Sequence, residues 1–212
     1  MSTQTAPAVY PVQFSVEYPD RPLNRLTSAF RIVVAIPIII VLESVSGGHF
    51  APSKGSDVVL YGAGGMLFIG PLLMILFRRK YPRWWFDWNL ELQRFSNRVV
   101  VFLALMDDRY PSTDERQSVQ LDIDYPDASR DLNRWLPLVK WFLAIPHFIV
   151  LFFLSIAAVF AVIVAWFAIL FTGRYPRGIF DFVEGVLRWS QRVVAYALLL
   201  VTDRYPPFSL AA

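Results

Sequence analysis

Residues 77–88 read FRRKYPRWWFDW, and residues 171–182 repeat the phrase as FTGRYPRGIFDF. Each copy directly follows a long apolar run. Other segments recur in the same order, namely VQFSVEYPD (12–20) with VQLDIDYPD (119–127), RFSNRVV (94–100) with RWSQRVV (188–194), and DRYP at 108–111 and 203–206. Matches in the same order, with shifts in spacing and one insertion in the first copy, indicate a tandem duplication. We predict a flexible N-terminus at 1–9, a first repeat at 10–112 and a second repeat at 113–212.

The composition favours a membrane protein. The chain is 56% hydrophobic and 17% charged, whereas soluble domains are about 45–50% apolar and about 25% charged. The absence of cysteine excludes disulfides and thiolate metal sites. We find no haem, zinc, phosphate-loop or hydrolase motif, and carboxylate pairs such as Asp107-Asp108 are expected to be solvated. The sequence therefore predicts no catalytic residue, cofactor or metal, and no binding of nucleic acid.

Each repeat opens with a short alternating segment. Val12, Phe14 and Val16 alternate with polar residues, and 119–123 shows the same pattern. A period of two predicts a half-buried strand. We expect the two strands to pair with each other, or with the DRYP segments, in a small sheet outside the bilayer.

The apolar runs predict spans. Segments 23–45 and 58–77 are long enough to cross, since a span needs about 20 residues. The run 136–171 would extend about 54 Å as one helix, which exceeds a hydrocarbon core of about 30 Å. We therefore expect two helices with a turn near 154–157. The predicted fold is an all-α integral membrane protein of two transmembrane hairpins, four spans in all.

An amphipathic helix is predicted after each hairpin, at 86–106 and 180–202, lying in the membrane interface. The charged residues in these segments fall in one stripe, which is either a solvated face or a conduction or docking face. They are Asp87, Arg94, Arg98, Asp181, Arg188 and Arg192.

The four-span arrangement predicts the orientation of the chain. Only Lys54 of the 20 Lys and Arg residues falls on the far side, if Arg31 and Lys140 extend toward the near side. Cytoplasmic loops carry the excess of basic residues, so both termini are expected in the cytoplasm and 46–57 outside. A six-span arrangement with inverted repeats is the alternative.

Two sets of residues are candidates for contacts with partners. Lipid headgroups, anionic ones in particular, would be anchored by basic and aromatic side chains near the repeated phrase, namely Arg78, Arg79, Lys80, Arg83, Trp84, Trp85, Arg174 and Arg177. Small residues would permit close helix packing, either within the protein or with another membrane protein or a second copy. These are Ala157, Ala161, Ala165, Gly62 and Gly65.

His147 follows Pro146 in a predicted span. It is either a functional group or a partner for backbone groups that the proline frees.

The segments AIPHFIVLFFL, AWFAILFTGRYPRGIFDFVEGVLRWSQRV and LLVTDRYPPFSL resemble the bacterial membrane family named domain of unknown function 4389. The likeness covers about 90 residues of the second repeat. The first repeat is divergent, with Trp84-Trp85 in place of Gly178-Ile179 and Ile38 in place of His147. The resemblance implies a bacterial integral membrane protein with two tandem copies of a hairpin unit, and it implies no reaction. We expect a non-catalytic accessory or scaffold subunit of the inner membrane; the alternative is a transporter or channel component that works as an oligomer.

Overall fold

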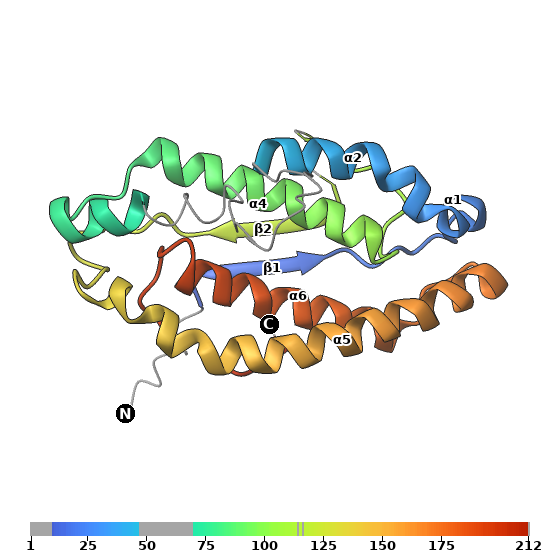
Figure 1. Cartoon of the computed structure of the whole chain (residues 1–212). Helices are drawn as coiled ribbons and strands as arrows, with labels where there is room; N and C mark the ends of the chain where they lie inside the picture. Colours follow the sequence, from blue (N-terminus) through green and yellow to red (C-terminus); the bar gives the residue numbers. More distant parts are fainter. Residues whose placement is uncertain (1–9, 47–69, 114, 116, 212) are drawn as a thin grey trace, which may run out of the picture.

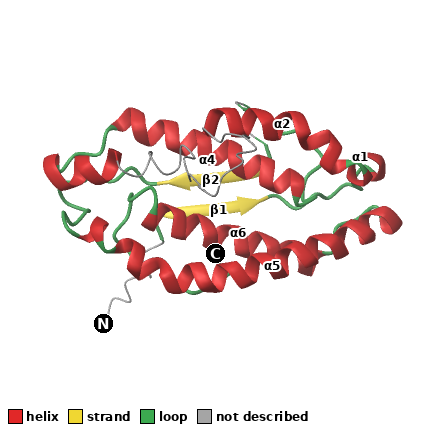
Figure 2. Cartoon of the chain, in the orientation of Figure 1, coloured by secondary structure: helices red, strands yellow, loops and turns green. Residues whose placement is uncertain are grey.

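The computed structural model describes residues 10–46, 70–113, 115 and 117–211. Figure 1 shows the arrangement of the elements, and Figure 2 colours them by type. In chain order they are β1 (Val12–Val16), α1 (Arg25–Ala29), α2 (Arg31–Ser46), the π-helical turn η1 (Met74–Arg78), α4 (Arg83–Leu103), β2 (Val119–Ile123), the 3-10 turn η2 (Leu136–Leu138), α5 (Lys140–Thr172) and α6 (Arg177–Ala197).

The two strands pair with each other, which is one of the two pairings that the sequence left open. They run antiparallel, and Phe14 lies opposite Leu121 at the centre of the ladder. Successive side chains of a strand point to opposite faces, and both strands bury every second residue. The other face of the sheet is polar and exposed; it carries Gln13, Ser15, Gln120 and Asp122.

Each strand packs against the helix of the other repeat. In Figure 1 β2 lies beside α4, and β1 lies beside α6. The tyrosine that follows each strand also bonds to the other repeat. The Tyr18 hydroxyl donates to the Tyr175 carbonyl at 2.5 Å, and the Tyr125 hydroxyl donates to the Tyr81 carbonyl at 2.5 Å. The two halves of the chain therefore interlock around one sheet.

Equivalent residues of the two repeats meet at the centre of the molecule. The Gln191 side-chain amide donates to the Asn97 amide oxygen at 2.9 Å, and both side chains are buried. These two residues occupy the same place in the matched phrases RWSQRVV and RFSNRVV. Phe14 and Leu121 are also equivalent, so the contacts follow an approximate two-fold relation between the repeats. The boundary at 112/113 stays a prediction.

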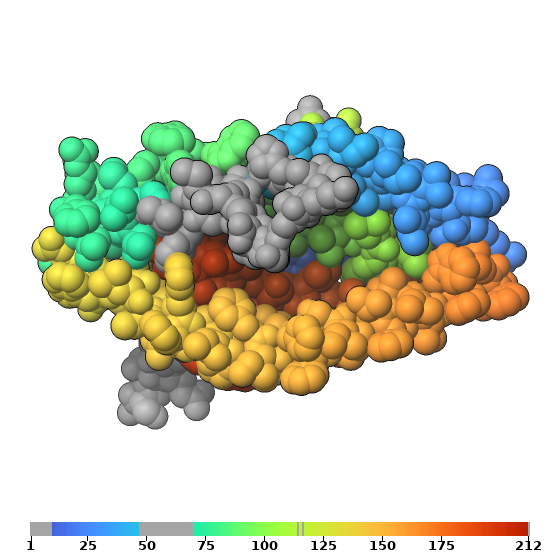
Figure 3. Space-filling model, viewed as in Figure 1, coloured from blue at the N-terminus to red at the C-terminus, as the bar shows by residue number. Residues whose placement is uncertain are grey.

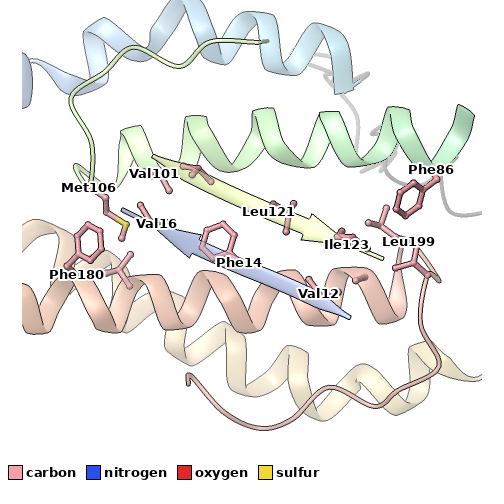
Figure 4. Packing of buried hydrophobic residues seen from close by; sticks show 14 of the residues in the cluster. Val12, Phe14, Val16, Phe86, Val101, Met106, Leu121, Ile123, Phe180 and Leu199 are labelled. Atoms are coloured by element: carbon pink, nitrogen blue, oxygen red, sulfur yellow. The ribbon is translucent and has the colours of Figure 1, made fainter. Parts of the chain in front are cut away.

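The main core fills the space between the sheet and the helices. Figure 4 shows Ile123 beside Phe86 and Leu199, with Phe14 and Leu121 nearer the middle of the strands. Ala165 and Ile169 of α5 belong to the same buried cluster. The buried sides of the sheet and of α5 therefore face one shared interior.

The prediction of four transmembrane spans is wrong. In the described part of the chain α5 is the one helix long and apolar enough to cross a membrane. The segment predicted as the first span is broken at Phe30 into α1 and α2, and α2 has 16 residues, fewer than the roughly 20 that a span needs. The neighbouring residues 70–78 are helical, but most of the second predicted span lies outside the described residues.

The predicted turn near 154–157 is also absent, because α5 continues through it without interruption. Leu, Ser, Ile and Ala at these positions contain no glycine or proline that would end a helix. The helix ends instead at Gly173, which has φ 75° and whose N–H donates to the Ile169 carbonyl at 2.7 Å, a common helix termination. The helix packs along α6.

The two amphipathic helices exist as α4 (Arg83–Leu103) and α6 (Arg177–Ala197), but their apolar faces pack on the protein itself. Pro82 and Pro176 precede α4 and α6, so the repeated phrase starts each helix. Both helices bury one face against the sheet, and they also contact α2 and α5 respectively. The sequence period showed their amphipathic character, but it could not show that protein rather than lipid covers the apolar side.

Several predictions fall on parts of the chain outside the described residues. These are the flexible N-terminus at 1–9, most of the external loop at 46–57 with Lys54, and the packing glycines Gly62 and Gly65.

Candidate functional site

The outward side of α5 is the most unusual surface of the molecule. Only 6% of the most apolar 18-residue stretch of this helix is buried. Seven of its phenylalanines are exposed, among them Phe152 at 62%, Phe153 at 64% and Phe160 at 65%. In Figure 3 the helix runs along most of the lower side of the molecule. Monomeric soluble proteins rarely expose an apolar patch larger than a few hundred Å².

The inward side of α5 packs on the protein along its full length. The buried residues recur at steps of three and four, as neighbours on one helix face do: they are Lys140, Ala144, His147, Leu151, Ala165 and Ile169. Half-buried Leu154, Ala158 and Ala161 continue the row through the middle. The helix is therefore attached along one side and uncovered along the other.

Helices α1 and α2 extend the apolar surface. Leu26 and Phe30 are 70% and 59% exposed, and Ile32 and Ile40 are 77% and 59% exposed. We name the exposed apolar side chains of α1, α2 and α5 the apolar face. The buried sides of α5 and of the sheet meet in one core, so the outward side of α5 and the polar face of the sheet point away from each other.

Basic residues lie near both ends of α5. The first basic end consists of Arg78, Arg79, Lys80 and Arg83, all exposed. It lies beside the start of α5, because the Arg134 guanidinium donates to the Leu76 carbonyl at 2.5 Å. The second basic end consists of Arg25, Arg174 and Arg177, also exposed.

The second basic end is fixed at the far end of α5 by a backbone bond. The Leu23 N–H donates to the Gly173 carbonyl at 2.8 Å, which holds the segment with Arg25 next to the segment with Arg174. Arg83 and Arg177 are partly engaged, with Asp87 at 3.4 Å and Asp181 at 3.0 Å. The predicted headgroup residues thus divide between the two ends of one helix.

The two tryptophans predicted as headgroup anchors differ. Trp84 is 68% exposed, whereas Trp85 is half-buried against the main core. The small residues also differ, because Ala165 is fully buried and Ala161 packs on the core, while Ala157 is exposed. Ala161 and Ala165 therefore pack inside the protein.

The four arginines of the charged stripe bind the protein's own backbone. Arg94 Nε donates to the Leu121 carbonyl at 2.9 Å, and Arg188 Nε donates to the Phe14 carbonyl at 2.9 Å. Further along, Arg98 donates to Ser112 and Thr113, and Arg192 donates to Ser209 and Ala211. Asp87 and Asp181 remain exposed near the helix starts. The stripe holds the strands and the segments that follow each helix.

Two buried cations were misjudged from the sequence. Arg31 and Lys140, expected to extend toward headgroups, are 3% and 0% exposed. Arg31 donates to the Asp107 carbonyl at 3.0 Å, and Lys140 donates to the Thr202 carbonyl at 2.7 Å. Arg31 and Lys140 occupy equivalent positions in the two repeats. This equivalence was a sequence signal that both side chains bind backbone carbonyls of the protein.

His147 lies in an aromatic cluster rather than against the backbone near Pro146. Its Nδ1 accepts a hydrogen bond from the Trp189 indole at 3.1 Å. Its ring stacks on Phe208 with centroids 4.0 Å apart. Tyr205 also contacts this ring, and its hydroxyl donates to the Leu143 carbonyl at 2.9 Å. The histidine thus fastens the C-terminal segment to α5 and α6.

A cleft of about 510 Å³ lies between the end of β1 and the segment after α4. Its buried acid is Asp107, which accepts from Ser118 at 2.5 Å and from Arg109 Nε at 3.0 Å. Burial acts to raise the pKa of Asp107, but these hydrogen bonds outweigh it and hold the pKa below the usual value. The described residues contain no group of three or more His, Asp or Glu placed to bind a metal ion.

The comparisons with known proteins bear on part of the chain. The comparisons with curated proteins and with solved structures gave no match. One family model matches, at residues 135–209, which contain α5, α6 and most of the C-terminal segment. The expectation of two tandem copies is not supported, since the first repeat has no such match. Residues 135–209 are therefore similar to the family described as "Domain of unknown function (DUF4389)".

Proposed function

We propose that this is a non-catalytic protein of the bacterial inner membrane, held on the bilayer by the apolar face and serving as an accessory or scaffold subunit for a membrane partner. The observation that carries the proposal is the uncovered side of α5. Transfer of one exposed phenylalanine into an apolar environment is worth about 1.5–3 kcal/mol. Seven such side chains on one helix strongly favour lipid over water.

The accessory role is supported by what the polar side chains do. The four stripe arginines, Arg31 and Lys140 all bind backbone carbonyls of this chain. A transport pathway normally needs ionisable groups that face a cavity or one another across the membrane. Because the charged groups stabilise the fold, the transporter alternative has less support.

Membrane attachment can be tested by placing charges on the apolar face. We expect the double variant Phe152→Glu/Phe160→Glu to lose its membrane affinity by at least about 100-fold, because each change removes an apolar contact and adds a charge. The protein should move from the membrane to the soluble fraction. The control Ser15→Glu/Gln120→Glu places the same charges on the polar face of the sheet and should stay with the membrane. If the two variants partition alike, the apolar face is not the attachment surface.

The accessory role requires a partner. We expect gentle solubilisation of native membranes, followed by measurement of the intact-complex mass, to give the 24.4 kDa chain together with a different protein at fixed stoichiometry. A chain found alone, or only as a symmetric homo-oligomer, would contradict the accessory role and leave membrane attachment intact.

A further inference from the structure

We propose that α5 lies in the plane of one membrane leaflet, with both basic ends at the same headgroup layer, instead of crossing the bilayer. This inference rests on the proposed membrane attachment and adds its geometry. The occupant of the apolar face is then a single leaflet with anionic headgroups. The sheet faces the water on that same side of the membrane.

The first reason is that both ends of α5 are fastened to the same body. At the start, the Lys140 ammonium forms an ion pair with Asp203 at 2.7 Å. Toward the end, the Trp166 indole donates to the Ser28 carbonyl at 3.0 Å, and Gly173 is bonded to Leu23. A helix that crossed the bilayer would hold its two ends on opposite sides of it.

The second reason is the helix that accompanies α5. The row of inward residues packs against α6 in two clusters, one around Trp189 and one in the main core. If α5 crossed the membrane, α6 would enter the hydrocarbon with its Glu184–Arg188 pair and with Arg192. Charged groups at that depth are costly. An in-plane helix keeps α6 above the lipid.

The third reason is the distribution of charge. A helix of 33 residues is about 50 Å long at 1.5 Å per residue, so the basic ends are widely separated along one surface. The repeat places part of them at equivalent positions, because the phrase around Arg174 matches the phrase around Lys80. Basic residues beside an apolar surface complement anionic headgroups. Two such ends on one leaflet fit an in-plane helix.

The chain has no cysteine, so single cysteines report sidedness directly. We would introduce Lys80→Cys at the first basic end, Arg174→Cys at the second, Ser15→Cys on the sheet and Phe160→Cys on the apolar face. Each full-length variant would be treated with a membrane-impermeant maleimide in spheroplasts and in inside-out vesicles. We expect cysteines 80, 174 and 15 to react from the same side, and cysteine 160 to react from neither side until detergent is added.

Each outcome separates the two claims. Reaction of cysteines 80 and 174 from opposite sides of a membrane-bound protein overturns the in-plane arrangement while attachment stands. A protein that remains in the soluble fraction overturns attachment and, with it, this inference. A cysteine at 160 that reacts as readily as the one at 15 also overturns it, because the apolar face would then lie in water.

Discussion

Replacing Arg188 with methionine is expected to lower the free energy of unfolding by about 3–5 kcal/mol, because the change removes one member of a largely buried ion pair. The Arg188 side chain is 13% exposed and Glu184 is 14% exposed. Arg188 also donates to the Phe14 carbonyl at 2.9 Å and to the Leu210 carbonyl at 3.0 Å. It therefore ties α6 to the outer edge of β1 and to the C-terminal segment. Denaturant unfolding in detergent micelles, followed by tryptophan fluorescence, would measure the loss.

Arg177→Met is the matched control on the same helix. Arg177 also pairs with an acid four residues away, but the two side chains are 65% and 53% exposed, and such pairs contribute about 0–1 kcal/mol. Adding Glu184→Gln to Arg188→Met should recover part of the loss, since the uncompensated carboxylate disappears. Equal, small losses for Arg188→Met and Arg177→Met would mean that Arg188 does not hold the strand.

Asp203→Asn is expected to lower the free energy of unfolding by a comparable amount, because it leaves a buried cation near the start of α5 without its partner. Lys140 is fully buried, and its ammonium lies 2.7 Å from the Asp203 carboxylate. Asparagine keeps an acceptor for the Asn133 N–H, which bonds Asp203 at 2.5 Å, but removes the negative charge. Leaving a buried charge unpaired costs about 3–5 kcal/mol. The same unfolding measurement would show a lower midpoint.

Two further variants make this test specific. Asp181→Asn breaks an exposed pair and should change the stability by less than about 1 kcal/mol. Lys140→Met/Asp203→Asn removes both charges and should recover most of the stability, because well-packed apolar replacements for a buried pair are often neutral. A double variant as unstable as Asp203→Asn alone would show that packing or the Thr202 carbonyl, rather than the unpaired charge, explains the loss.

Local patterns in the sequence were reliable guides to local structure. The alternation around Phe14 and Leu121 predicted the two strands, and the amphipathic segments 86–106 and 180–202 predicted the helices α4 and α6. The four-span prediction failed because hydropathy measures the composition of a segment but not what covers it. For α5, the row from Lys140 to Ile169 packs on α6, which the hydropathy of the run 136–171 does not reveal. The lack of glycine and proline at 154–157 was a signal in the sequence against a turn there.

The surface was predicted only in part. Lys80 and Arg174 were singled out as headgroup residues, but their positions near opposite ends of one helix depend on tertiary contacts. Arg94 and Arg188 were recognised as one stripe, yet the carbonyls that they bind belong to strands of the other repeat. Such exchanged contacts cannot be read from the period of a single helix.

The most direct test of the central claim is a scan of spin-labelled single cysteines from 151 to 165, measuring access to oxygen, which enters lipid, and to a polar nickel complex, which stays in water. If lipid covers the apolar face, oxygen access should rise and fall with the helical period. Maxima are expected at 152, 156, 160 and 163 and minima at 151, 158 and 165, with little nickel access anywhere. High nickel access at 152 and 160, or a break in the period near 154–157, would contradict a continuous helix with one side in the membrane.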